Sequence, residues 1–200
     1  MMKVGKQIGL FLVAALILSG CSNSAAGSES SAAQTETETS QAETERVGET
    51  AVTSLPQIDS TKWQYNSEDK VYWQTGISYC ENPADENYET LGIFIPAVYM
   101  NAKDNGDGTF TCKINNQVAV KGYTAASAPI VIPVNTPGYS AMEAPTDYVT
   151  DSASYTSAGF IYVATGCRGR DAGAPAGVTD LKAAIRYIRY NDGVIPGDVD

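Results

Sequence analysis

Two arginines and an aspartate stand close together in a glycine-rich stretch of the chain, at Arg168, Arg170 and Asp171. A guanidinium is a planar donor that binds a carboxylate through two parallel hydrogen bonds. These side chains could therefore fix the turn by a guanidinium–carboxylate contact within the protein, which is the interpretation we favour. The alternative is that they bind a carboxylate or a phenol of a substrate.

The chain contains no histidine among its 200 residues. A serine nucleophile in the Ser-His-Asp mechanism needs an imidazole to accept its hydroxyl proton. The Gly-x-Ser-x-Gly motif, which presents such a serine on a sharp strand-to-helix turn, does not occur in the sequence either. We therefore predict no catalytic residue of this kind in the chain, and no serine-esterase activity from the chain alone.

The N-terminus has the features of an export signal. Lys3 and Lys6 precede an apolar run over residues 8–18, which is too short for a comfortable membrane span. The sequence Leu18-Ser19-Gly20-Cys21 that follows resembles the lipobox of bacterial lipoproteins. This resemblance implies cleavage before Cys21 and lipidation of its sulfur. We thus expect residues 1–21 to be the signal peptide and lipobox, and the protein to be exported and anchored by lipid in the cell membrane.

Residues 22–59 are rich in Ser, Thr, Ala and Glu and contain few large apolar residues. Such a composition cannot bury enough surface to offset chain entropy, so we predict a disordered acidic tether. The whole chain has 13 Lys and Arg against 23 Asp and Glu, a formal net charge of −10. This charge argues against a nucleic-acid partner, which requires a basic surface.

The other three cysteines are Cys80, Cys112 and Cys167. An exported protein can form a disulfide, and we expect Cys80 and Cys112 to be the pair because both lie in the early, strand-rich part. Three free, buried thiols remain the alternative. The absence of histidine and of any Cys-x-x-Cys spacing predicts no metal site, and we predict no cofactor.

Apolar patterns predict a series of strands in residues 60–200, which we expect to be the folded domain. Aromatic residues alternate over residues 63–79, as in two antiparallel strands. Continuous apolar runs predict buried strands at residues 91–96, 129–133 and 160–164. Residues 104–109, which are rich in Asp, Asn and Gly, predict a turn before a returning strand at residues 110–114.

A helix is predicted from about residue 178 to residue 191. Val178, Leu181, Ile185 and Ile188 recur every three or four residues, which places them on one apolar face of an amphipathic helix. A strand leading into a helix is half of a parallel βαβ unit. The fold class is therefore α/β, with an antiparallel β-meander leading into parallel strands with flanking helices, and we expect it to be incomplete at residue 200.

Residues 130–139 and 159–171 resemble the bacterial tannase and feruloyl-esterase-like group of α/β-hydrolases, as do residues 176–187 and 195–198. The resemblance implies that the chain is the N-terminal portion of such an enzyme. Its serine nucleophile would follow the helix, beyond residue 200. The loop after the third strand of that fold supplies an oxyanion-hole N–H, and here the loop offers Thr136, Gly138 and Tyr139, because Pro137 has no N–H. The alternative is that the loop is only a tight turn.

Together with the lipobox-like residues, this family resemblance implies part of a cell-surface carboxylic-ester hydrolase, which at full length would act on a small-molecule or plant-polymer ester. Two other functions remain open from the sequence. One is a non-catalytic surface lipoprotein that binds a ligand through its strand-rich domain. The other is a different α/β-hydrolase, such as an acetylesterase or a peptidase.

Overall fold

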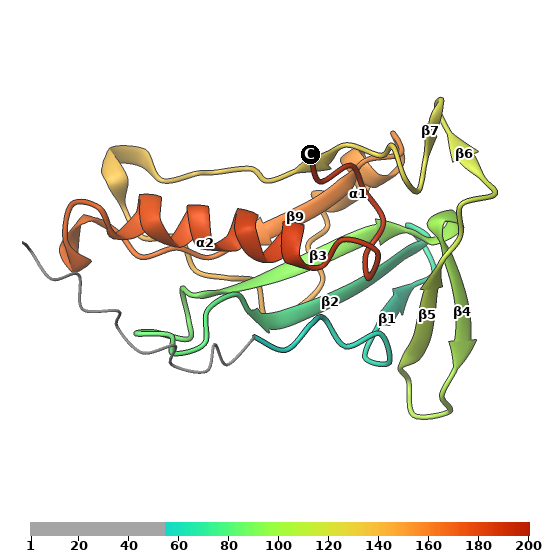
Figure 1. The fold of residues 1–200 in the computed structure, drawn as a ribbon, viewed down its shortest axis with the longest axis horizontal. Helices are drawn as coiled ribbons and strands as arrows, with labels where there is room; N and C mark the ends of the chain where they lie inside the picture. Colours follow the sequence, from blue (N-terminus) through green and yellow to red (C-terminus); the bar gives the residue numbers. More distant parts are fainter. Residues whose placement is uncertain (1–54) are drawn as a thin grey trace, which may run out of the picture. The chain divides into compact units, whose positions relative to one another are not determined.

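The computed structural model describes residues 55–200 (Figure 1). The predicted signal peptide, Cys21 and most of the predicted tether lie outside these residues. Ile58 is buried in the main core. The packed part of the chain therefore begins before residue 60, the first residue of the predicted folded domain.

A five-stranded mixed sheet forms the centre of the fold, in the order β1-β2-β3-β9-β8. Its strands are β1 (Gln64–Asn66), β2 (Val71–Ser78), β3 (Thr90–Pro96), β9 (Ile161–Thr165) and β8 (Ile130–Val131). Neighbours from β1 to β9 are antiparallel, whereas β8 and β9 are parallel. An antiparallel meander thus leads into parallel strands, as expected for part of an α/β fold.

The chain returns to the sheet after its last helix. Asp198 forms a parallel bridge with Pro129, next to β8, and its N–H donates to Ala128 O at 2.9 Å. Gly197 passes close to Ile130, and a Cβ at this position would meet the Ile130 side chain at 2.7 Å. The chain therefore reaches the free side of β8 where the second strand of the βαβ unit is expected.

Helix α2 (Ala176–Tyr190) covers one face of the sheet (Figure 1). The predicted apolar face is wrong in part, because Val178 is 55% exposed and Ile185 is 42% exposed. The side chains that α2 buries are instead Ala176, Asp180, Ala184, Tyr187 and Ile188. Two apolar rows are present on this helix, and the row that contains the fully buried Ala184 is the one that faces the main core.

The other face of the sheet carries a smaller, aromatic core. Trp73, Phe94 and Tyr162 are buried there, and Tyr148 packs edge-on against both Trp73 and Phe94. The short helix α1 (Ser152–Thr156) lies between β8 and β9 in the chain and contacts both β3 and β9. It closes this side of the sheet and completes the parallel crossover.

Two hairpins lie outside the main sheet. One is formed by β4 (Met100–Asp104) and β5 (Phe110–Ile114), as the turn residues predict. The other joins β6 (Ala119–Val120) to β7 (Tyr123–Thr124). Within residues 55–200, no group of three His, Cys, Asp or Glu side chains could hold a metal ion. In the same part of the chain, no helix combines the length and the apolar character needed to cross a bilayer.

The expected disulfide between Cys80 and Cys112 does not form, and both are free thiols, as is Cys167. The positions of the two residues along β2 explain this. Phe110, which precedes Cys112 on β5, packs edge-on against Tyr72 at the start of β2, whereas Cys80 lies beyond the opposite end of that strand. Two cysteines can be bridged only if their Cα atoms lie within about 7 Å.

We expect the thiols to differ in reactivity at pH 8. Burial raises the pKa of Cys112 to about 11, and also raises the pKa of Cys80 and of Cys167. Cys112 and Cys167 are fully buried, whereas Cys80 is partly exposed. Iodoacetamide should therefore label Cys80 first, because thiolate attack also requires access. Mass spectrometry of the labelled peptides tests this, and labelling of native Cys112 as fast as in urea would contradict it.

The raised pKa of Cys112 also gives stability a dependence on pH. Its thiol ionises near pH 9 in the unfolded chain and near pH 11 in the folded one. The contribution of this thiol to stability is complete below pH 9 and is lost as the pH rises towards 11.

Candidate functional site

Three loops meet at one edge of the sheet. Strands β2 and β9 are both antiparallel to β3, and β8 is parallel to β9, so β2, β8 and β9 end at the same edge. The loops that follow them cover residues 79–89, 132–151 and 166–175. The carboxyl edge of parallel strands is where ligand sites form in open α/β sheets.

The loop after β8 contains a short 3-10 turn, Pro137–Tyr139. Gly138 and Tyr139 have left-handed φ values of 61° and 60°. The Tyr139 N–H donates to Thr136 O at 3.0 Å, so that donor is already used in the turn. The N–H groups of Thr136 and Gly138 donate no hydrogen bond within residues 55–200. These two groups are therefore the available oxyanion-hole candidates.

The loops after β8 and β9 are tied together by backbone hydrogen bonds. Met142 and Cys167 exchange N–H···O bonds of 2.8 and 2.9 Å. Gly169 lies against the backbone of Ser140 and Ala141, so closely that a Cβ has no room there. The Arg170 guanidinium reaches across to donate to Gly138 O at 3.3 Å. The position of the Gly138 turn thus depends on the loop after β9.

A pocket of about 220 Å³ lies between these two loops and the first turns of α2. Val134, Leu181 and the exposed Val178 give it an apolar side. Its polar lining includes Thr136, Ser140, Arg168 and Arg170. Tyr139 lines the pocket while being 75% exposed. The pocket could hold one small group with both apolar and hydrogen-bonding parts.

Arg168 binds two buried carboxylates beside this pocket. Its Nε and Nη2 donate to Asp180 at 3.0 and 2.7 Å, and its backbone N–H donates to the same carboxylate at 2.8 Å. Its Nη2 also lies 3.2 Å from Glu89 Oε1. Asp180 and Glu89 are 2% and 6% exposed. The hydrogen bond to Asp180 raises the pKa of Arg168 further, so the guanidinium stays charged.

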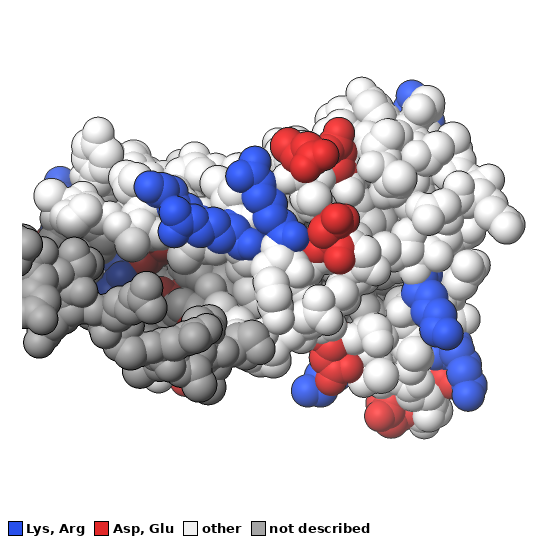
Figure 2. Space-filling view, in the orientation of Figure 1, with Lys and Arg blue, Asp and Glu red and all other residues white. Residues whose placement is uncertain are grey.

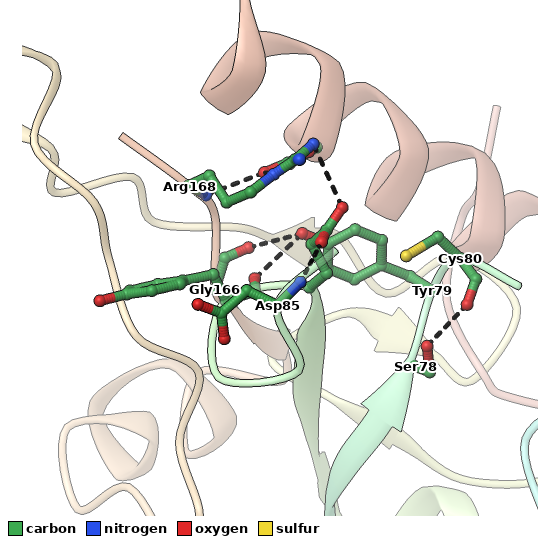
Figure 3. A network of polar contacts seen from close by, with 9 residues as sticks. Ser78, Tyr79, Cys80, Asp85, Gly166 and Arg168 are labelled. Atoms are coloured by element: carbon green, nitrogen blue, oxygen red, sulfur yellow. Dashed lines mark hydrogen bonds and ion pairs between the residues drawn. The ribbon is translucent and has the colours of Figure 1, made fainter. Parts of the chain in front are cut away.

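The same cluster joins the loop after β2 to the loop after β9 (Figure 3). The Tyr79 hydroxyl lies 2.9 Å from Gly166 O and 3.1 Å from Tyr88 O. Burial raises the pKa of Tyr79, which keeps its hydroxyl neutral. The second oxygen of Glu89 accepts the N–H of Asp85 at 2.8 Å. In Figure 3, Tyr79, Asp85 and Gly166 lie below α2, and the Arg168 side chain lies between them and the helix.

The three charged residues singled out in the sequence thus have different surroundings. Arg168 has a carboxylate partner within the protein, but this partner is Asp180, with Glu89, rather than Asp171. Asp171 is exposed and forms no ion pair within residues 55–200. Asp180 lies in the second turn of α2. From the sequence alone, the only reason for an acidic residue near this helix N-terminus is its favourable interaction with the helix dipole.

The outer surface of α2 is basic. Figure 2 shows Lys and Arg side chains gathered over this helix, and the exposed basic residues of α2 are Lys182, Arg186 and Arg189. Arg189 donates to Val199 O at 2.9 Å, which fixes the segment that returns to the sheet. Exposed charge of this kind is ordinary on an amphipathic helix.

No family model and no curated protein matches the sequence. Solved structures do resemble it. The tannase of Fusobacterium nucleatum is 31% identical over 64% of this chain, with a TM-score of 0.50. A tannin acyl hydrolase in complex with ethyl gallate is 30% identical over 64%, with a TM-score of 0.50. A mercury derivative of tannin acyl hydrolase is 27% identical over 72%, with a TM-score of 0.52.

The chain spans only 27 to 33% of the length of these proteins. Within that part, three-dimensional similarity is accompanied by sequence identity of about 30%. The similarity supports a tannase-like hydrolase fold that is present here in part.

Proposed function

We propose that this chain is the N-terminal part of a tannase-like carboxylic-ester hydrolase. The observation that carries the proposal is the similarity of the structure to the tannase of F. nucleatum at 31% identity. The mixed sheet and the loops that meet at its carboxyl edge are consistent with it. The serine and histidine of such an enzyme would come from residues beyond these 200, because the chain has no histidine.

The loop of residues 136–139 would stabilise the negative charge that develops on the ester carbonyl oxygen. An oxyanion hole requires N–H donors about 2.7 to 3.1 Å from that oxygen. Thr136 and Gly138 carry N–H groups that are free of other bonds within the described residues. Arg170 would act as a positioning residue, because its contact with Gly138 O holds the turn.

The substrate would be a small-molecule or plant-polymer ester with an aromatic acyl group. The pocket next to Gly138 combines the apolar Val134 and Leu181 with the exposed ring of Tyr139. Exposed aromatic and apolar side chains stack on aromatic rings, and Arg170 and Ser140 offer hydrogen bonds to phenolic hydroxyls. One of the similar solved structures contains ethyl gallate, an ester of this class.

The protein would act outside the cytoplasm, at the surface of the cell. The lipobox-like residues 18–21 support lipidation of Cys21, and the membrane lipid would then be its anchoring partner. The acidic net charge of −10 supports the absence of a nucleic-acid partner. Metabolic labelling with palmitate, compared between the natural chain and Cys21→Ser, tests the anchor, and equal labelling of both would contradict it.

A chimeric enzyme tests the ester chemistry. Residues 55–200 would replace the matching segment of the F. nucleatum tannase, and hydrolysis of methyl gallate would be followed. We expect turnover from the chimera and none from the chain alone, because only the chimera contains a histidine and a nucleophilic serine. A folded chimera without turnover, or hydrolysis by the chain alone, would contradict the proposal.

Substrate profiling of an active chimera distinguishes a tannase-like esterase from a different α/β-hydrolase. Faster hydrolysis of acetyl esters or peptides than of galloyl and feruloyl esters would favour an acetylesterase or a peptidase. The absence of histidine is the observation that favours a non-catalytic binding protein as the second candidate.

A further inference from the structure

An uncovered apolar strip runs along one flank of α2. Val178 is 55% exposed and Ile185 is 42% exposed, with the half-buried Leu181 between them. Their spacing of three and four residues places these side chains in one row along the helix. Val134 is 51% exposed and lines the same pocket as Val178 and Leu181, so it extends the strip onto the loop after β8. Contiguous apolar side chains that stay exposed are typical of a surface that binds another segment or protein.

The strip lies between the two other surfaces of α2. The buried side chains of this helix, among them Ala184, face the core, whereas its exposed cations Lys182 and Arg186 face water. The strip occupies the flank between them. This is the flank of a helix that a neighbour contacts when two helices pack side by side on the same sheet.

The sheet is open on the side of α2 that carries the strip. Within residues 55–200, β8 is the last strand of the sheet, and Asp198 forms its parallel bridge with Pro129 beside it. Both β3 and β9 already have two neighbours. The parallel part of the sheet can therefore grow only outward from Asp198, past the loop that carries Val134.

The handedness of the crossovers assigns a face to the next helix. Connections between parallel strands are right-handed in nearly all proteins. Helix α1 leads from β8 inward to β9, and α2 leads from β9 outward to Asp198. The two helices lie on opposite faces of the sheet, as this rule requires. A helix that continues outward from a strand at Asp198 would lie on the same face as α2, next to the strip.

We propose that the apolar strip is the docking surface for this next crossover helix. The helix would belong to the rest of the hydrolase, since the similar solved structures are about three times as long as the part that this chain matches. The inference rests on the proposed function, which makes the chain the N-terminal part of such an enzyme. Val134 and Val178 also line the pocket beside Gly138, so the docked helix would close the apolar side of that pocket against water.

Cysteine labelling tests the docking. Ile185→Cys would be treated with iodoacetamide in the chain alone and in the chimera with the F. nucleatum tannase, and mass spectrometry of the peptides would follow this thiol separately from the natural ones. We expect labelling to be at least about tenfold slower in the chimera, because thiolate attack requires access. Lys182→Cys is the matched control on the outer surface of the same helix, and it should react equally fast in both proteins. Equal rates for Ile185→Cys in the two proteins would overturn the proposal.

The same measurement separates the other outcomes. If Ile185→Cys in the chain alone reacts more slowly as the protein concentration rises, the strip binds a second copy of the chain and the proposal is overturned. Labelling requires no turnover, so its result is independent of the ester chemistry. A chimera that protects Ile185→Cys without hydrolysing methyl gallate would support the docking and refute the proposed chemistry. Hydrolysis by a chimera in which Ile185→Cys is unprotected would refute the docking alone.

Discussion

Replacement of Arg168 by methionine is expected to lower the free energy of unfolding by about 2 to 4 kcal/mol. The change leaves Asp180 and Glu89 without their cation, and both carboxylates are buried. When a buried carboxylate loses its partner, no attraction compensates for the loss of its hydration, and the folded state is destabilised. The expected loss is smaller than for a fully buried pair, because the Arg168 side chain is 25% exposed and water screens part of its charge.

Urea unfolding followed by tryptophan fluorescence measures this change. Trp63 and Trp73 are 1% and 7% exposed in the folded protein, so their emission should shift on unfolding. Arg186→Met is the matched control, since it makes the same substitution at an exposed arginine of α2 that forms no ion pair within residues 55–200. A loss of the same size in both variants would show that the buried carboxylates are not the cause.

The conservative variant Arg168→Lys separates charge from geometry. A lysine keeps the positive charge but cannot make the two parallel hydrogen bonds that Arg168 makes to Asp180. We expect its stability to lie between those of the natural chain and Arg168→Met. Stability equal to that of Arg168→Met would mean that the geometry of the fork, and not the charge, holds the cluster together.

The buried strands were predictable because they are long apolar runs. Residues 91–96 and 160–164 were expected as strands, and the structure has β3 at Thr90–Pro96 and β9 at Ile161–Thr165. The run at residues 129–133 yields only the two-residue β8, because Pro129 and Pro133 flank it and proline cannot donate to a ladder. Local pattern thus identifies a strand but does not fix the length of its pairing.

The face of α2 could not be read from spacing alone. Its two apolar rows have similar periodicity, and the row that is buried includes Asp180, which a pattern of apolar residues places on the outside. Asp180 can be buried because it forms an ion pair with Arg168, which lies in the loop after β9. Arg168 also pairs with Glu89, which comes from a third segment of the chain. Pairings between such distant segments depend on the topology, and a single sequence does not reveal them.

In the candidate site, too, the sequence identifies a local element but not the contacts that this element makes. The turn at residues 136–139 was identified from its glycine and from family resemblance, but the sequence left three possible donors. The structure reduces these to Thr136 and Gly138, because the Tyr139 N–H is used within the turn. The close contact of Gly169 with this loop had no signal in the sequence beyond one more glycine in a glycine-rich stretch.

That contact makes Gly169→Ala the second substitution with a large expected effect. The added methyl group would collide with the backbone of Ser140 and Ala141, which cannot move away as a flexible side chain could. Overpacking of this kind costs about 1 to 3 kcal/mol, and more where backbone must shift, so we expect a loss of about 3 kcal/mol in urea unfolding. Ala172→Ser is the control, because it adds one atom at an exposed position of the same loop.

The same substitution links stability to the proposed chemistry. Gly169 and the hydrogen bonds between Met142 and Cys167 hold the loop after β8 against the loop after β9. If Gly169→Ala pushes them apart, the N–H groups of Thr136 and Gly138 move away from the edge where the ester carbonyl would lie. In the chimeric tannase, we therefore expect kcat to fall by about tenfold to a hundredfold with little change in KM, since an oxyanion donor acts mainly in the transition state. A variant with full kcat would place the oxyanion hole elsewhere.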